Sequence, residues 1–344
     1  MTQYVILYCY ALYASLIEVF LSKKMRLSAI LLFIGAVMVL GYRGIDGVDT
    51  PNYISFFSDI GTKNALDYNM DTGFYMLSSF IKWIKGDIVF YFICLAIISV
   101  GLKIWVMKKL SPAPIFGIFI LLGTYFMSLE ANQVRQALAL GVVLMSLLFV
   151  LKRKRIYFFL LVLLAASFHI SALVFIPVWW LYELRFSAKT LLILVSISFL
   201  FVFISLVDTF QYGVKYTVFW GSFIFYKLEN YASKMEKVGF SPIQLWYIFT
   251  CFLFVFQKKR INQPSYNFLL NIFVLGVVMN FFLNSFSYMI RITYYFLAVE
   301  GILFSMVILK SKKIINKLFL FTGVAALIFF KSYKYYLSNL EFFQ

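Results

Sequence analysis

A series of long apolar runs, separated by short basic segments, constrains this chain more than any other feature. A membrane crossing by a helix takes roughly 20 predominantly apolar residues. Hydrophobic residues make up 63% of the 344 residues and charged residues only 13%, which is typical of a polytopic membrane protein. The sequence therefore predicts an all-α, single transmembrane domain over residues 1–344 with about twelve transmembrane helices. The runs lie near 2–21, 28–42, 88–107, 113–129, 133–151, 156–169, 170–183, 190–207, 242–257, 266–284, 292–309 and 314–330.

The basic residues predict the orientation of these helices. More than half of the 31 Lys and Arg residues fall in six short segments, which the positive-inside rule assigns to the cytosolic side. Both termini then lie outside. The net charge of +17 is distributed as a topology signal, so we expect no nucleic-acid partner. The six segments are 23–26, 103–109, 152–155, 185–189, 258–260 and 310–317.

Two longer segments fall on the outer side. Residues 43–87 form an outer loop, in which Phe74, Leu77, Ile81 and Ile84 recur at helical spacing and predict an interfacial amphipathic helix. Residues 208–241 form a second outer loop, or cap. The tail at 331–336 is interpreted as an interfacial anchor without chemistry.

Residues 156–183 are short for two full crossings at roughly 20 residues each. A single long crossing would invert every later loop and put basic segments outside. We therefore expect two short helices that meet at His169, the only histidine of the chain. Broken helices at membrane depth are tolerated where they line a cavity, which would leave His169 at the bottom of a water-accessible dip.

Arg135 is the first candidate for chemistry. It stands at the start of a predicted span, and on a helix Asn132 and Gln136 would share its face, because residues three and four apart are neighbours. An ionisable side chain at membrane depth usually faces a partner, a cavity or a ligand. The structural alternative is a buried ion pair with Glu130.

Further candidates lie on the predicted outer side. Arg43 precedes Asp46 and Asp49 in a glycine-rich loop, and Arg291 begins a later span. Three arginines suit a doubly charged phosphate group, because each guanidinium offers bidentate donors and stays charged. A histidine such as His169, or a nearby carboxylate, can act as a general base at neutral pH.

Each of these candidates also has a structural interpretation. Asp46 and Asp49 could bind a metal, yet such a pair is more often turn chemistry. His169 could be a satisfied core histidine, and Arg291 could anchor its span at the interface. No Walker A, G-x-S-x-G or H-E-x-x-H motif occurs in the sequence. We therefore expect neither a metal nor a cofactor.

Four motifs follow one another along the chain: Tyr42-Arg43-Gly-Ile-Asp46-Gly-Val-Asp49-Thr-Pro-Asn-Tyr53, Asn132-Gln-Val-Arg135-Gln136-Ala-Leu-Ala139, Ser167-Phe168-His169-Ile-Ser171-Ala172 and Arg291-Ile-Thr-Tyr294-Tyr295-Phe296. Together they resemble the EpsG family of Wzy-type polysaccharide polymerases, which includes O-antigen, capsule and exopolysaccharide polymerases. The first three motifs are the clearest part of the resemblance.

The resemblance implies a glycosyltransferase of GT-C-like architecture in the bacterial cytoplasmic (inner) membrane, with its active site facing the periplasm or the outside. Its donor and acceptor would be oligosaccharide repeat units on undecaprenyl diphosphate, as in lipopolysaccharide biosynthesis, and a chain-length regulator protein is a possible partner. The expected catalytic residues are His169, Asp46 and Arg135. The expected substrate-binding residues are Arg43, Asp49, Tyr53, Asn132, Gln136, Arg291 and Tyr294.

Several rival functions share some of these features. A lipid-linked oligosaccharide flippase would place ionisable residues through the membrane centre and show paired halves. An O-antigen ligase would use the same donor and similar arginines. A membrane acyltransferase would carry its histidine on a cytosolic-side tunnel, and a structural scaffold would need neither Arg135 nor His169.

Overall fold

The structure is a computed structural model that describes residues 2–22, 25–44, 47–62, 70–204, 240–286 and 289–338. Every regular element in these ranges is a helix, which confirms the predicted all-α class. The chain divides into two compact units. The first unit comprises Met1–Tyr182 and Ala298–Gln344, and the second comprises Glu183–Leu297.

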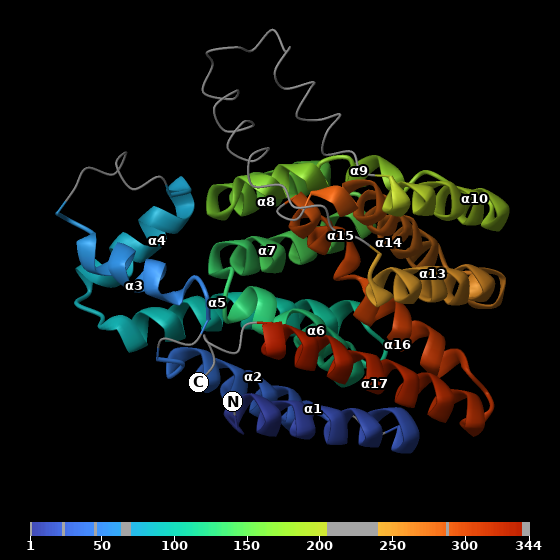
Figure 1. Cartoon of the computed structure of the whole chain (residues 1–344), viewed down its shortest axis with the longest axis horizontal. Coiled ribbons are helices and arrows are strands. Elements are labelled where there is room, and N and C mark those ends of the chain that lie inside the picture. The colour runs from blue at the N-terminus through green and yellow to red at the C-terminus, as the bar shows by residue number, and fades with distance from the viewer. Residues whose placement is uncertain are drawn as a thin grey trace, which may run out of the picture. The chain divides into compact units, whose positions relative to one another are not determined.

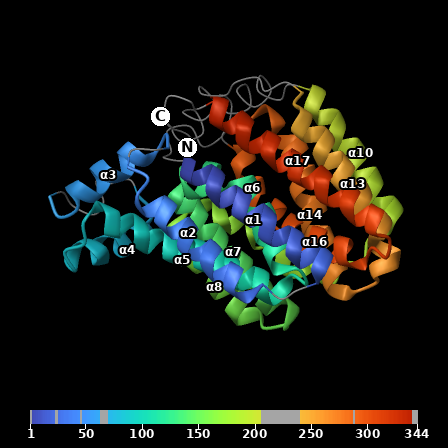
Figure 2. The same cartoon turned by 90° about the horizontal axis from the view of Figure 1, so that it is seen from below.

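In the first unit, α7 packs against both α5 and α8, while α6 packs against α1, α16 and α17 (Figures 1 and 2). Its elements are α1 (Thr2–Leu21), α2 (Arg26–Gly41), α3 (Thr50–Asp59), α4 (Thr72–Trp83), α5 (Ile88–Leu110), α6 (Pro114–Tyr125), the π-helix η2 (Phe126–Glu130), α7 (Val134–Leu151), α8 (Arg155–Phe168), η3 (Ile170–Phe175), α9 (Val178–Leu181), α16 (Glu300–Lys310) and α17 (Ile314–Ser338).

In the second unit, α14 packs against α10, α13 and α15. Its elements are α10 (Ala188–Phe199), η4 (Leu200–Phe203), α13 (Pro242–Ile261), α14 (Pro264–Phe282), η5 (Leu283–Ser285), η6 (Met289–Thr293) and α15 (Tyr294–Leu297). The cap predicted at 208–241 lies outside the described residues, apart from its last two.

Helix ends follow ordinary capping chemistry. Asp87 caps α5, because its carboxylate accepts the Phe90 amide at 2.7 Å. Ser241 and Gln244 form a capping box at the start of α13, and Asn262 ends that helix in the left-handed conformation. Glu18 lies within a predicted span, and its carboxylate accepts the Phe116 amide at 2.9 Å, which satisfies a free donor in the first turn of α6.

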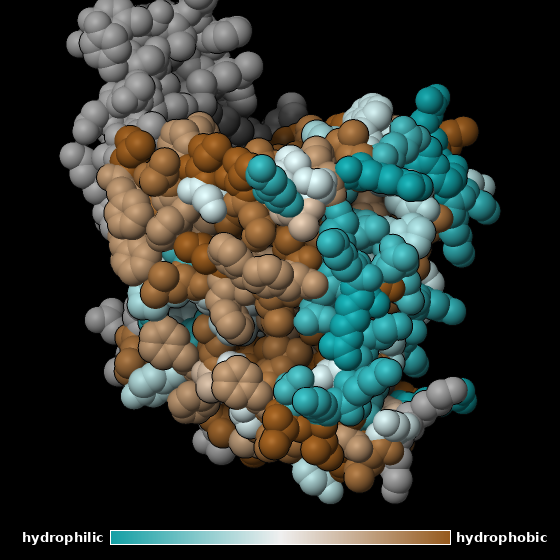
Figure 3. Space-filling view, turned by 90° about the vertical axis from the view of Figure 1, so that its right-hand side faces the viewer, coloured by the Kyte–Doolittle hydropathy of each residue, from teal (hydrophilic) through white to brown (hydrophobic). Residues whose placement is uncertain are grey.

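Six helices are long and apolar enough to cross a membrane: Gln3–Leu21, Ile88–Leu110, Val134–Leu151, Pro264–Phe282, Met289–Lys310 and Ile314–Leu337. Further apolar helices of 10–17 residues occur, among them Arg26–Gly41 and Arg155–Phe168. Large apolar side chains are exposed along these helices, and broad areas of the surface are apolar (Figure 3). The multi-pass helical character is thus confirmed, while twelve crossings and a GT-C-like arrangement stay predictions.

Helix α4 is the amphipathic helix that the sequence predicts. Of the predicted face, Phe74 and Ile81 are buried and Leu77 is partly buried, whereas Ile84 follows the helix and is 43% exposed. The buried face belongs to a core cluster that joins α3, α4, α5 and α7. Residues 50–59 and 72–83 are therefore packed helices and not a loose loop.

The predicted break at His169 is confirmed. Helix α8 ends at Phe168, and the His169 backbone is extended, with φ −157° and ψ 114°. The chain continues as the 3-10 helix η3. At about 1.5 Å per residue, α8 is about 20 Å long, which is shorter than a hydrocarbon core of about 30 Å.

The early part of α1 contacts the late part of α17. The Ser332 hydroxyl, near the end of α17, donates to the Tyr8 hydroxyl of α1 at 3.1 Å. We predict that cysteines at positions 2 and 340 will react with a membrane-impermeant maleimide from outside intact cells. Labelling of both positions only after access to the cytosolic face would show that the predicted topology is wrong.

Candidate active site

Asp71 brings together two residues that the sequence predicted as catalytic. Its Oδ2 accepts from Arg135 Nη1 at 2.9 Å and lies 3.7 Å from His169 Nδ1. Its Oδ1 accepts from the backbone amide of Ile170 at 3.2 Å. The Arg135 and His169 side chains remain 30% and 29% exposed, so both can reach a bound molecule.

A close approach of two helices creates this contact. Asp71 immediately precedes α4, and a Cβ added at Gly73 would lie 2.9 Å from the Ser167 carbonyl oxygen and closer still to the Ser167 side chain. Only glycine allows the first turn of α4 to approach the end of α8 so closely. The Asp71 carboxylate thereby reaches the break at His169.

The electrostatics of this cluster keep Asp71 ionised. Burial raises the pKa of Asp71, but the His169 side chain, the Arg135 charge and the Ile170 amide together outweigh it, so the pKa lies below its ordinary value. Tyr53 is buried, which raises the pKa of its hydroxyl, and this hydroxyl is hydrogen-bonded to Arg135. The guanidinium is therefore held from two sides.

Asn132 makes hydrogen bonds to two further segments of the chain near Arg135. Its Oδ1 accepts from the Asp49 amide at 2.8 Å, and its Nδ2 donates to the Tyr335 hydroxyl at 2.6 Å. Gly47 has φ +101°, and a Cβ there would lie 2.4 Å from the Ala131 carbonyl oxygen. The loop at 47–49 is thus pressed onto the turn that precedes α7.

The surroundings of Asn132 change two interpretations of the sequence. Asn132 does not share a helix face with Arg135, because α7 begins only at Val134, after the π-helix η2 and a turn. The tail at 331–336 is more than an interfacial anchor, since Tyr335 binds Asn132 from α17. Gln136 does lie on α7 and is buried.

We predict that Tyr335→Phe weakens activity through Asn132. Loss of the hydroxyl leaves the buried Nδ2 of Asn132 without this acceptor, which costs about 1 kcal/mol or more and corresponds to an activity roughly five times lower. Product yield from purified protein measures the effect. Tyr333→Phe is the matched control, because Tyr333 is 49% exposed on the same helix. Equal losses in the two variants would contradict the positioning role of Tyr335.

Arg43 is buried. Its Nη1 donates to the Glu130 carbonyl oxygen at 3.0 Å, and its guanidinium lies 3.8 Å from the centre of the Phe92 ring. Burial lowers the pKa of Arg43 to about 10, so the side chain stays charged at neutral pH. These partners tie the end of α2 to η2 and give Arg43 a supporting position in the first unit.

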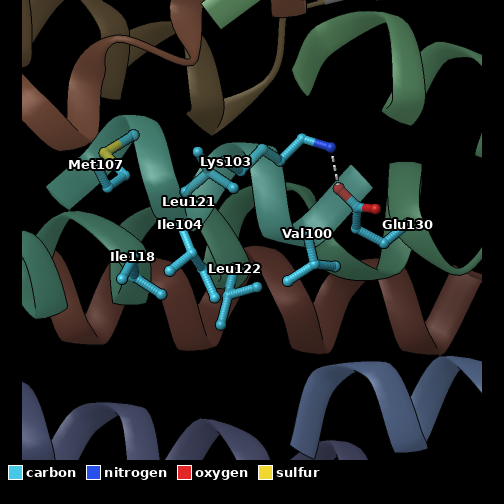
Figure 4. A pocket seen from close by; sticks show the side chains of 8 residues that line it. All are labelled: Val100, Lys103, Ile104, Met107, Ile118, Leu121, Leu122 and Glu130. Carbon is cyan, nitrogen blue, oxygen red and sulfur yellow. Dashed lines mark hydrogen bonds and ion pairs between the residues drawn. The ribbon is translucent and has the colours of Figure 1, made fainter. Parts of the chain in front are cut away.

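Glu130 does not pair with Arg135, so the alternative of a buried ion pair between these two residues is wrong. Its carboxylate pairs instead with Lys103 (Figure 4). The Ser99 hydroxyl also donates to this carboxylate, at 2.8 Å. Lys103 is 2% exposed and also donates to the Ala137 carbonyl oxygen at 2.6 Å. The assignment of Lys103 to a cytosolic loop was therefore wrong, because it lies inside α5 on the wall of a small, mostly apolar cavity.

We predict that Lys103→Met strongly destabilises the protein. Removal of one partner leaves the Glu130 charge buried and uncompensated, which costs about 3–5 kcal/mol of unfolding free energy. Lys103→Met with Glu130→Gln should recover most of this loss. Reversible unfolding in mixed micelles measures both variants, with the exposed Lys108→Met on the same helix as control. A double variant as unstable as the single one would contradict a charge effect.

Three predicted site residues are left: Asp46, Arg291 and Tyr294. Asp46 lies outside the described residues. Arg291 and Tyr294 belong to the second unit, on η6 and α15. Their convergence with Arg135 stays a prediction. Within the described ranges, no three His, Cys, Asp or Glu side chains gather as a metal site.

Sequence reasoning missed Asp71 and Tyr335. Asp71 stands 64 positions before Arg135, among several similar aspartates of one outer segment. Its signal was the N-cap position of an amphipathic helix, directly before Thr72 and Gly73. Tyr335 lies 203 positions after Asn132 and had no signal beyond the aromatic residues around it.

These features define a multi-pass helical membrane protein in which an arginine, a histidine and an aspartate gather at one end of the first unit. Residues 26–344 match the EpsG family, and the chain belongs to that family. Membership indicates a membrane protein of the polysaccharide polymerase type, with glycosyltransferase-like activity in general terms. No curated protein and no solved structure shows significant similarity to the chain.

Proposed function

We propose that this protein polymerises oligosaccharide repeat units carried on undecaprenyl diphosphate into an O-antigen, capsular or exopolysaccharide chain. The proposal rests on the cluster of Arg135, Asp71 and His169. In this cluster, the Asp71 carboxylate lies beside both the proposed cation for the leaving group, Arg135, and the proposed base, His169. Family membership supports the class of reaction.

The chemistry that we propose needs two groups. The growing chain leaves its lipid diphosphate, whose negative charge Arg135 neutralises from a fixed position, with Arg291 as a proposed second donor. The acceptor hydroxyl of a new repeat unit loses its proton to His169, with Asp46 as the alternative base. Five further residues are proposed to hold the sugars or the groups that contact them: Asp49, Tyr53, Asn132, Gln136 and Tyr294.

The proposed location follows from the membrane character of the chain. We infer that the cluster faces the outside of the bacterial cytoplasmic membrane, because short basic segments favour the cytosolic side. The lipid-linked donor and acceptor would then enter sideways from the bilayer. Exposed apolar side chains leave such a path open to lipid, among them Leu160 and Leu163 of α8 and Ile170 of η3.

Purified protein in lipid nanodiscs, incubated with one lipid-linked repeat unit, tests the proposal. A polymerase produces a ladder of products that differ by one repeat and remain on the lipid. A flippase yields no covalent product, and a ligase transfers the glycan to a different acceptor without a ladder. We expect the ladder to persist in EDTA. A ladder that stops with EDTA and returns with Mg²⁺ would contradict the arrangement without metal.

A further inference from the structure

The Oδ2 atom of Asp71 lies close to the side chains of both Arg135 and His169. Asp71 Oδ2 accepts the Arg135 hydrogen bond at 2.9 Å, and the same oxygen is the atom nearest to His169 Nδ1, at 3.7 Å. The longer distance exceeds that of a normal hydrogen bond. Asp71 Oδ2 is therefore hydrogen-bonded to Arg135, whereas His169 Nδ1 lies just beyond hydrogen-bond distance from this oxygen.

The imidazole is oriented toward this oxygen. His169 Nδ1 is buried, and none of the described residues offers it a hydrogen-bond partner within normal distance. Asp71 itself is fixed on its other oxygen by the Ile170 amide, the residue that follows His169. A small movement of the carboxylate about this anchor would bring Oδ2 to Nδ1.

We propose that Asp71 is a positioning residue for His169, and that a diphosphate bound at Arg135 releases Asp71 Oδ2 to accept a hydrogen bond from His169 Nδ1. This inference rests on the function proposed above. A diphosphate carries more negative charge than one carboxylate and offers several oxygens to the guanidinium fork, so it competes effectively for Arg135. The released carboxylate then fixes the Nδ1–H tautomer and leaves Nε2 as the proton acceptor.

The transfer step balances with these groups. The acceptor hydroxyl oxygen forms a bond to the anomeric carbon of the donor as the bond from that carbon to the diphosphate oxygen breaks. The electron pair of the broken bond leaves with the diphosphate beside Arg135, and the hydroxyl proton moves to His169 Nε2. Asp71 stabilises the imidazolium. The base is thus assembled only when a donor diphosphate is present, which disfavours reaction at an unoccupied site.

The single histidine makes the test direct. Full-length protein with ¹⁵N-labelled histidine gives the two ring-nitrogen signals of His169 alone. At pH 8, where an ordinary imidazole is neutral, inorganic diphosphate is titrated while ³¹P signals report its binding. We expect the ring signals to move to the Nδ1–H tautomer as diphosphate binds.

Two variants separate positioning from folding. Asp71→Asn should bind diphosphate without the tautomer change and should lower the polymerisation rate roughly 10²- to 10⁴-fold. Arg135→Gln frees Asp71 permanently and should show the Nδ1–H tautomer before any diphosphate is added. Asp59→Asn, on α3 of the same outer segment, is the matched control and should respond as the natural chain does.

The outcomes separate this inference from the proposed function. No diphosphate binding, binding without a tautomer change, or the same change in Asp71→Asn would overturn it. A glycan ladder together with an unchanged imidazole would overturn only this inference and keep the polymerase. The tautomer change without any ladder would support the diphosphate-dependent contact and count against the polymerase.

Discussion

His169→Gln is expected to leave a folded protein that binds lipid-linked substrate but forms almost no polymer. Glutamine keeps a polar side chain of similar reach, yet it cannot accept a proton as a base. Removal of a general base typically lowers the rate by about 10²- to 10⁴-fold. His169→Ala should lose as much activity. Ladder formation from a lipid-linked repeat unit, followed over time, measures the rate in both variants.

Binding and folding controls make this result specific. Size-exclusion profiles and substrate binding should match those of the natural chain, because the His169 side chain is 29% exposed and its backbone, not its ring, caps α8. A full ladder from His169→Gln would reduce His169 to a positioning residue. Asp46 would then become the leading candidate for the base.

The helices could be predicted from the sequence because apolar runs and basic segments are local signals. The run at 133–151 became α7, Val134–Leu151. The break at His169 followed from the length of 156–183 together with the basic segments that come after it. Lys103 was wrongly assigned to a loop, because a lysine near the end of an apolar run resembles a loop residue. Its buried partner Glu130 comes from another helix, and that pairing is tertiary.

The candidate site could be predicted only in part, for the same reason. Arg135 and His169 stand out as ionisable residues beside apolar runs, and that rarity is visible in the sequence. Asp71 joins them only because Gly73 lets α4 pack onto the end of α8. The position of Asn132 depended on where α7 begins, and the π-helix η2 together with a turn delays that start to Val134. No local pattern encodes these contacts.

Arg135→Lys is expected to lower polymerisation about 10²- to 10³-fold, the range seen when one preorganised donor to a developing anion is removed. Lysine keeps the positive charge, but it loses the planar fork that can donate to two oxygens of the diphosphate at once. The hydrogen bond to Tyr53 also depends on this fork. We expect substrate to bind while transfer slows, so the loss should fall mainly on kcat in the ladder assay.

Arg153→Lys is the matched control for this prediction. Arg153 is an exposed residue that follows α7 at its opposite end, where its guanidinium lies 5.1 Å from the Trp179 ring centre and 5.0 Å from that of Tyr182. The same substitution there should leave the ladder nearly unchanged. Arg291→Lys should resemble Arg135→Lys if both arginines hold the diphosphate. Normal polymerisation by the Arg135→Lys and Arg291→Lys variants alike would show that neither guanidinium holds the leaving group, and the positive charge would have to come from another part of the chain.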